Sequence, residues 1–320
     1  MLLILNNRSR FSVRRPASLA LVASFAGLGL LLSACSTTAG GTPQASAGDG
    51  VVEVVASTSV YGDIVRSIGG DKVSVTSLIT RTSQDPHSYE VTTQDKLAVS
   101  KAGLVVENGG GYDGFIQKLA DDTGVDHKNV LNVVEVSGLV QDGQVPSGFN
   151  EHVWYSLPAM SRLADALAAR LGDLEPSSAE TFKKNAAAFS QGLTGLDARL
   201  AAIKAAGGPV PVAVTEPVPL YLLEAAGLEN KTPGAYTAAI EEDADVPPAV
   251  LSEAIRLVGS GEIRLLAYNT QTEGPQTLAL KKAAGAAGVP VVNFSETLPD
   301  GKSYLQWMTE NVDGIAKALA

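Results

Sequence analysis

From residue 51 onward, short β-branched runs alternate with amphipathic stretches. In the first half the predicted strands are Val51–Ser57, Val73–Ile79, Leu104–Glu107 and Val130–Val134. In the second half they are Val210–Thr215, Ile263–Tyr268 and Val289–Phe294. Predicted helices lie between and after these strands, the last being Tyr304–Leu319. Alternation of strand and helix is typical of parallel βα units. The pattern therefore predicts an α/β protein with two Rossmann-like lobes, each built on a mainly parallel sheet.

The two halves are separated by a long helical stretch in which no strand is predicted. After Pro176, apolar residues recur at helical spacing, namely Phe182, Phe189, Leu193, Leu196, Leu200 and Ile203. This spacing predicts one amphipathic helix of roughly 30 residues. The predicted organisation is a first lobe at 51–175, a linking helix at 176–207 and a second lobe at 208–320. The pattern alone fits both a packed surface helix and a rigid strut between the lobes.

The first 50 residues are not expected to belong to the fold. Residues 1–34 combine four arginines with an apolar run too short for a comfortable membrane span, which is the layout of a secretory signal peptide. The apolar run ends at Leu32-Ser33-Ala34-Cys35, and this order resembles the bacterial lipobox, in which the cysteine is lipidated. Residues 35–50 contain no large apolar side chain after Cys35 and predict a flexible tether. The alternative is an ordinary export signal with a buried free thiol.

The amino-acid composition and net charge exclude several classes of protein. The chain is 45% hydrophobic and 18% charged, which is typical of a globular protein, and its formal net charge is −10. An acidic balance argues against a nucleic-acid partner, since such proteins normally carry a basic face. Cys35 is the only cysteine, so an internal disulfide and a cysteine-rich metal cluster are both excluded.

Four polar residues follow predicted strands or precede predicted helices. His87 lies in a loop that contains Pro86, and His152 lies just before a helix. Glu216 directly follows Val210–Thr215, and Glu273 lies in the loop after Ile263–Tyr268. Taken singly, each histidine fits a structural role and each glutamate fits a helix cap.

Taken together, these residues have the chemistry of a metal site. Carboxyl ends of parallel strands form the ligand-binding edge of α/β proteins, so all four side chains are expected to face one cleft. Two neutral imidazoles and two carboxylates can hold Zn²⁺ or Mn²⁺ and neutralise its charge. Metal binding should weaken where the histidines take up protons, because only neutral imidazole coordinates. The third histidine, His127, lies in a polar turn and is not expected to be a ligand.

Several motifs resemble one known family over residues 51–320. They are DPHSYE at 85–90, AGLVVENGGGYDGF at 102–115, EHVWYSLP at 151–158, TEPVPLYLLEAAGL at 215–228 and SETLPDGKSYLQWM at 295–308. In these motifs the chain resembles the metal-binding substrate-binding lipoproteins of zinc/manganese-type ABC importers. The resemblance implies two βα lobes bridged by a long helix, with the metal ion between the lobes.

The resemblance also implies roles for individual residues. His87, His152 and Glu216 match three ligand positions of the family, and Glu273 is the nearest match to the fourth, a carboxylate. The implied function is capture of zinc or manganese outside the cytoplasmic membrane by a monomer anchored through Cys35. The ion would then pass to an ABC permease in that membrane. A glutamate as third ligand favours harder ions such as Mn²⁺, but the choice between zinc and manganese stays open.

Two other functions are consistent with an exported two-lobed protein. One is binding of a metal chelate such as a siderophore, which would require an aromatic and basic cleft, whereas only 5% of the residues are aromatic. The other is an exported zinc hydrolase, but the sequence contains neither HExxH nor GxSxG. The expectation is therefore a binding protein and not an enzyme.

Overall fold

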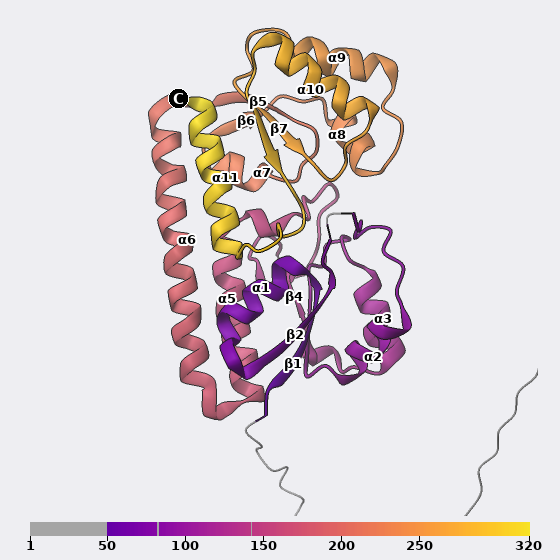
Figure 1. The fold of residues 1–320 in the computed structure, drawn as a ribbon, viewed down its shortest axis with the longest axis vertical. Coiled ribbons are helices and arrows are strands. Elements are labelled where there is room, and N and C mark those ends of the chain that lie inside the picture. The colour runs from indigo at the N-terminus through magenta and orange to yellow at the C-terminus, as the bar shows by residue number, and fades with distance from the viewer. Residues whose placement is uncertain (1–49, 82, 142) are drawn as a thin grey trace, which may run out of the picture. The chain divides into compact units, whose positions relative to one another are not determined.

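Two four-stranded parallel sheets organise the computed structural model, which describes residues 50–320 apart from 82 and 142 (Figure 1). The first sheet has the order β2-β1-β3-β4, with β1 Val52–Thr58, β2 Val73–Ile79, β3 Leu104–Glu107 and β4 Val130–Asn132. The second has the order β6-β5-β7-β8, with β5 Val210–Val214, β6 Leu228–Asn230, β7 Leu266–Asn269 and β8 Val291–Phe294. The two orders are equivalent, and every pairing is parallel. The predicted fold class is confirmed. The predicted signal peptide, Cys35 and all of the tether except residue 50 lie outside the described residues.

Helices connect the strands within each sheet and also separate the two sheets along the chain. With the first sheet are α1 Ser59–Gly69, α2 Thr93–Lys101, α3 Phe115–Thr123 and α4 Val133–Val136. Between the sheets come α5 Leu157–Leu174 and α6 Ala179–Gly207. With the second are α7 Leu220–Ala225, α8 Gly234–Glu241, α9 Pro248–Val258, α10 Pro275–Ala287 and α11 Tyr304–Leu319. The sequence pattern did not predict β6, α4, α8 or α9, and Val133 and Val134, predicted as the end of a strand, begin α4. Strand β6 has only three residues, too few to show an alternating pattern.

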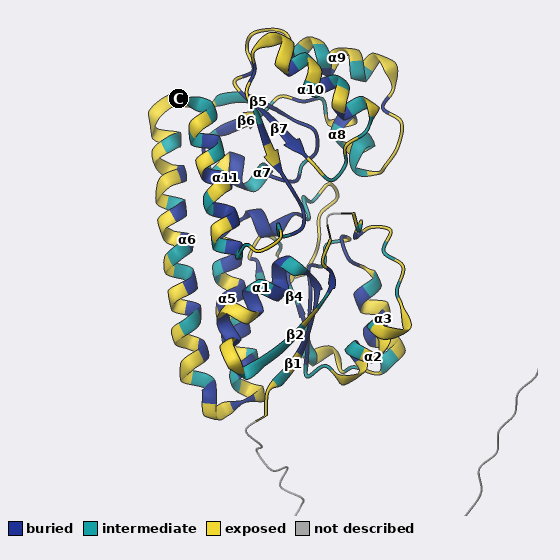
Figure 2. Ribbon diagram, in the orientation of Figure 1, coloured by how far each residue is buried: buried dark blue, intermediate teal, exposed yellow. Residues whose placement is uncertain are grey.

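Helix α6 packs against elements of both halves. It contacts α1 and α5 beside the first sheet and α7 and α11 beside the second (Figure 1). Five of the six residues predicted from the apolar spacing are buried, Ile203 is only partly buried, and Ala186 is buried in addition. Figure 2 shows that buried and exposed residues alternate along this helix. A Cβ atom at Gly192 would lie 2.8 Å from the Leu305 side chain, so the glycine lets α11 approach α6 closely. This is a packing role and not the bend that a mid-helix glycine suggests.

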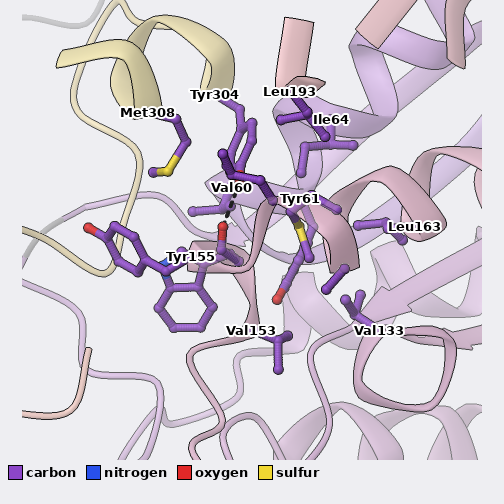
Figure 3. Packing of buried hydrophobic residues seen from close by; sticks show 14 of the residues in the cluster. Val60, Tyr61, Ile64, Val133, Val153, Tyr155, Leu163, Leu193, Tyr304 and Met308 are labelled. Atoms are coloured by element: carbon purple, nitrogen blue, oxygen red, sulfur yellow. Dashed lines mark hydrogen bonds between the residues drawn. The ribbon is translucent and has the colours of Figure 1, made fainter. Parts of the chain in front are cut away.

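Both faces of the first sheet are buried, which is typical of parallel sheets. On β1, Val54 and Ala56 face the large core formed with α1, α5, α6 and α11, whereas Val55 faces the smaller core under α2 and α3. Figure 3 shows side chains of this large core close together, among them Ile64, Leu163, Leu193 and Tyr304. The large core also includes residues of the second sheet, so the strands of both sheets are held by the same packed helices.

Among the described residues, no helix is both long and apolar enough to cross a bilayer.

Candidate metal-binding cleft

A cleft of about 500 Å³ lies between loops from the two halves of the fold. Its walls are the loops after β2 and before α5 on one side, and the loops after β5, α8, β7 and β8 on the other. Its acidic and imidazole residues are Asp85, His87, His152, Glu216, Glu241, Asp243, Asp245, Glu273 and Glu296. None of its described lining residues is a lysine or an arginine. Such a cleft attracts cations and repels anions.

A second cavity of similar volume opens at the other end of β5. It is lined mainly by apolar side chains such as Ile203, Val210 and Leu319, and its described lining includes no histidine. The chemistry that the sequence predicts is therefore concentrated in the first cleft.

His152 is fixed for coordination through one ring nitrogen. The side chain is buried, and its Nδ1 lies 2.7 Å from Oδ1 of Asn150. Asn150 donates from its amide nitrogen to the carbonyl of Pro217 at 3.0 Å, so its oxygen faces the imidazole and accepts from Nδ1–H. That partner leaves Nε2 as the unprotonated nitrogen, as in metal sites where a second group orients the ligand. Burial, followed by the nearby His87, lowers the pKa of His152 to about 3, so the ring is neutral.

His87 lies at the mouth of the cleft, in a turn held by its own loop. Asp85 accepts hydrogen bonds from the backbone N–H of His87 at 2.9 Å and from the Ser88 hydroxyl at 2.6 Å. The His87 side chain is 34% exposed, and its Nε2 lies 3.3 Å from a carboxylate oxygen of Glu151. His87 and His152 therefore reach the cleft from different segments, and both stand beside the ring of Tyr112, with centroids 5.2 and 5.9 Å away.

Glu216 and Glu296 are joined by a single amide. The side-chain nitrogen of Asn269, at the end of β7, donates to Oε2 of Glu216 at 2.6 Å and to Oε1 of Glu296 at 2.8 Å. The Thr272 hydroxyl also donates to Oε2 of Glu216. All three residues that meet at this point, Glu216, Asn269 and Glu296, are at least 93% buried. Two carboxylates from the second sheet therefore converge within the cleft.

Tyr112 links Glu296 to the first half of the fold. Its buried hydroxyl donates to Oε2 of Glu296 at 3.2 Å, while its ring contacts both cleft histidines. The turn before it is held by buried Asp113, which accepts from the backbone N–H groups of Asn108 and Gly109 at 2.6 and 2.9 Å. Tyr112 therefore touches three cleft side chains that belong to both sheets.

Glu273, which the sequence analysis gave as the fourth ligand, lies at the rim of the cleft. Its side chain is 47% exposed. One oxygen accepts from the Tyr268 hydroxyl at 2.8 Å and lies 3.3 Å from the ammonium of Lys281. These two hydrogen bonds lower the pKa of Glu273. The carboxylate of Glu273 is thus paired with Tyr268 at the end of β7 and with Lys281 on α10.

The remaining histidine lies outside the cleft. The His127 side chain is 79% exposed, and its Nε2 is 3.5 Å from Asp121. This position agrees with the expectation that His127 is not a ligand.

The buried carboxyl groups of the cleft disfavour each other's ionisation. Burial raises the pKa of Glu216 to about 7, and burial together with the neighbouring Glu216 raises that of Glu296 to about 7. Burial, and after it the negative charge of Glu241, raises the pKa of Glu151 to about 8. A divalent cation among these groups would remove the repulsion and replace the lost hydration.

The candidate side chains share the cleft without closing on a common point. Across the part of the chain that the structure describes, no three His, Cys, Asp or Glu side chains are arranged to hold an ion. His87 instead pairs with Glu151, and the two buried glutamates pair through Asn269. Coordination by all four therefore requires at least that the His87 side chain leaves Glu151.

Several known proteins with similar sequences or folds are named for the metals that they bind or transport. The chain is 26% identical to the manganese ABC transporter substrate-binding lipoprotein ScaA of Streptococcus gordonii, covering 90% of this chain and 94% of the relative. It is also 26% identical to the manganese lipoprotein PsaA of Streptococcus pneumoniae, covering 93% and 97%. The fold matches that of the periplasmic zinc binding protein TroA from Treponema pallidum with a TM-score of 0.68, at 23% identity, covering 83% of this chain and 98% of that one.

One family match covers most of the sequence. Residues 54–318 match the family described as zinc-uptake complex component A, periplasmic. A component of this kind binds a substrate for transport and is not an enzyme, which agrees with the absence of a recognised hydrolase motif in the sequence. The chain therefore belongs to the zinc-uptake complex component A family.

Proposed function

We propose that this protein captures a divalent transition metal ion, zinc or manganese, in the cleft and delivers it to an ABC permease. The observation that carries the proposal is that two imidazoles from the first half and two buried carboxylates from the second line the same cleft. Zn²⁺ and Mn²⁺ both accept nitrogen and oxygen ligands of these types. The lobes would be residues 51–175 and 208–320, joined by the helix within 176–207, and the protein would act as a monomer.

The proposed ligands are His87, His152, Glu216 and Glu296. Glu296 replaces Glu273 in this set because Glu296 is buried and shares the Asn269 amide with Glu216. It also lies two residues after the end of β8, at the edge of the sheet where ligands bind. Two neutral imidazoles and two carboxylates bring a divalent ion to zero net charge, which a buried site requires. Side chains from both lobes would thus be joined through the ion.

A plain metal salt tests this function. Equilibrium dialysis of the mature protein against Zn²⁺ or Mn²⁺, without a chelator, is expected to give one tightly bound ion per chain. Binding only when a siderophore-like chelator is added would favour the chelate alternative. The acidic lining argues against that outcome, because most such chelates are anionic. Metal-dependent hydrolysis of ester or peptide substrates would favour the hydrolase alternative.

Binding is expected to weaken as the pH falls from 8 to 6. In the metal-free protein the pKa values of Glu216 and Glu296 are about 7, so below pH 7 an ion must displace protons from them. Affinity should then fall by up to about tenfold per displaced proton for each pH unit. His152, with a pKa of about 3, stays neutral over this range, so the expected dependence is not set by its titration.

Calorimetric titration at pH 6, 7 and 8 measures this dependence. Repeating it in two buffers of different ionisation enthalpy counts the protons released per ion. An affinity that is constant from pH 6 to pH 8, with no proton release, would contradict the assignment of these two carboxylates.

Membrane attachment is proposed to run through Cys35. The curated relatives ScaA and PsaA are named lipoproteins, and Cys35 follows an apolar run in this sequence. Expression of Cys35→Ser in a bacterial host is expected to move the protein from the detergent phase to the aqueous phase, or to leave the precursor unprocessed. A variant that partitions like the unaltered protein would rule out the anchor.

A further inference from the structure

The two oxygens of Glu216 are not equally available to an ion. A carboxylate oxygen has two lone pairs, and Oε2 of Glu216 accepts two hydrogen bonds, one from Asn269 at 2.6 Å and one from the Thr272 hydroxyl. Both lone pairs of Oε2 are therefore used. An ion can reach this carboxylate only through Oε1 while both donors stay in place.

Glu296 is held less completely. Its Oε1 accepts from Asn269 and its Oε2 accepts from Tyr112, so each oxygen keeps one lone pair. The two histidines supply one nitrogen each. The four side chains then offer four ligand atoms, or five if Glu296 binds through both oxygens.

We infer that Thr272, acting with Asn269, holds Glu216 to a single oxygen and so makes the cleft selective for four-coordinate zinc over manganese. This inference rests on the proposed function and on the proposed ligands. Protein sites that close around Zn²⁺ are almost always four-coordinate, whereas Mn²⁺ prefers about six ligands, most of them oxygen. Manganese would need a second oxygen from Glu216 or additional water in a cleft with buried walls.

Thr272 is a better point of test than Asn269. Asn269 contacts both carboxylates, and its backbone N–H donates to Thr215 at 2.9 Å, so its replacement would disturb β7 as well as both ligands. Thr272 is half-buried, and of the two carboxylates its hydroxyl donates only to that of Glu216. Thr272→Val keeps the shape of the side chain and replaces the hydroxyl by a methyl group, which cannot donate to Glu216.

The chain offers two matched controls. Thr272→Ser retains a hydroxyl and should behave as the unaltered protein. Thr270→Val removes a hydroxyl from the same loop, one that donates to the carbonyl of Phe294 at 3.1 Å and to neither carboxylate. Melting of each metal-free variant reports whether the fold is retained.

The experiment measures the dissociation constants for Zn²⁺ and Mn²⁺ by competition with a chelator of known affinity, at one pH. Zinc is expected to bind more tightly throughout, as the Irving–Williams order requires. Thr272→Val is expected to lower the ratio of the Mn²⁺ dissociation constant to the Zn²⁺ dissociation constant by about tenfold, equivalent to about 1.4 kcal/mol. In both control variants this ratio should stay unchanged. X-ray absorption of the zinc complex of the unaltered protein should give four ligands, two of them imidazole.

Two results would overturn the inference. One is a Thr272→Val ratio within about twofold of the original, as equal weakening of both ions would give, and the other is a five- or six-coordinate zinc complex in the unaltered protein. In each of these the unaltered protein still binds metal, so the proposed function stands. Failure of the unaltered protein to bind either ion would overturn the proposed function as well.

Discussion

Glu296→Gln is expected to weaken zinc binding by about a thousandfold, equivalent to about 4 kcal/mol. The substitution keeps the size of a side chain that is 93% buried, but removes one of two carboxylates that neutralise the ion. The ion would then carry an uncompensated charge in a buried site, and one ligand would become a weaker amide oxygen. Isothermal titration, or competition with a chelator if binding is too tight, measures the change.

Glu273→Gln is the matched control, since it makes the same chemical change at the cleft rim. Its carboxylate is engaged with Tyr268 and Lys281, so zinc affinity should stay within about threefold, below 1 kcal/mol. Loss of affinity in Glu273→Gln with retention in Glu296→Gln would return the fourth position to the residue that the sequence first indicated.

Removing either cleft histidine is expected to have the next largest effect. His87→Ala and His152→Ala should each weaken zinc binding by about a hundredfold or more, because each removes one of the two imidazoles in the described lining of the cleft. His87 is the cleaner case, because its side chain is 34% exposed and its loss leaves the core intact. His152 is buried, so the melting temperature of that variant must be measured alongside its affinity.

His127→Ala serves as the comparison, with affinity expected within about threefold of the original protein. Its imidazole is exposed and pairs with Asp121, away from the cleft. Comparable losses in all three histidine variants would mean that the cleft is not the binding site.

Much of the fold could be predicted from the sequence, because many strands and helices show up as local patterns of apolar residues. The β-branched runs predicted β1 to β4 and the recurring apolar residues predicted α6, because burial on two faces of a strand or one face of a helix imposes these periods. Strand β6 and helices α8 and α9 were missed. They lie in a stretch with several prolines and acids, where short elements are held by packing between distant residues, such as Tyr236 with Leu280.

The candidate site was predicted in part for the same reason. His87, His152 and Glu216 each lie in a loop that the strand pattern places at the cleft. Glu296 satisfies the same criterion, since it follows the predicted strand Val289–Phe294 and lies within the SETLPDGKSYLQWM motif. The sequence indicated Glu273 because it is the charged residue of its loop and the nearest match to the fourth position of the family, whereas the pairing of its carboxylate with Lys281 and Tyr268 is visible only in the structure.

Other features of the cleft could not be predicted from spacing. Asn269 and Thr272 act on Glu216 from more than 50 residues away, and Tyr112 reaches Glu296 across 184 residues. The contacts with Glu216 arise because β5 and β7 pair within the second sheet, whereas the contact between Tyr112 and Glu296 arises only when the two halves of the fold come together. They determine which oxygens are free, and therefore bear on which ion the cleft selects.

The most direct test of the account is a crystal structure of the zinc-loaded protein with anomalous scattering recorded on both sides of the zinc edge. The account predicts one anomalous peak in the cleft, about 2.0–2.2 Å from a nitrogen each of His87 and His152 and from an oxygen each of Glu216 and Glu296. A peak ligated by Glu273 in place of Glu296, or the absence of any peak in the cleft from a crystal grown with saturating zinc, would contradict it.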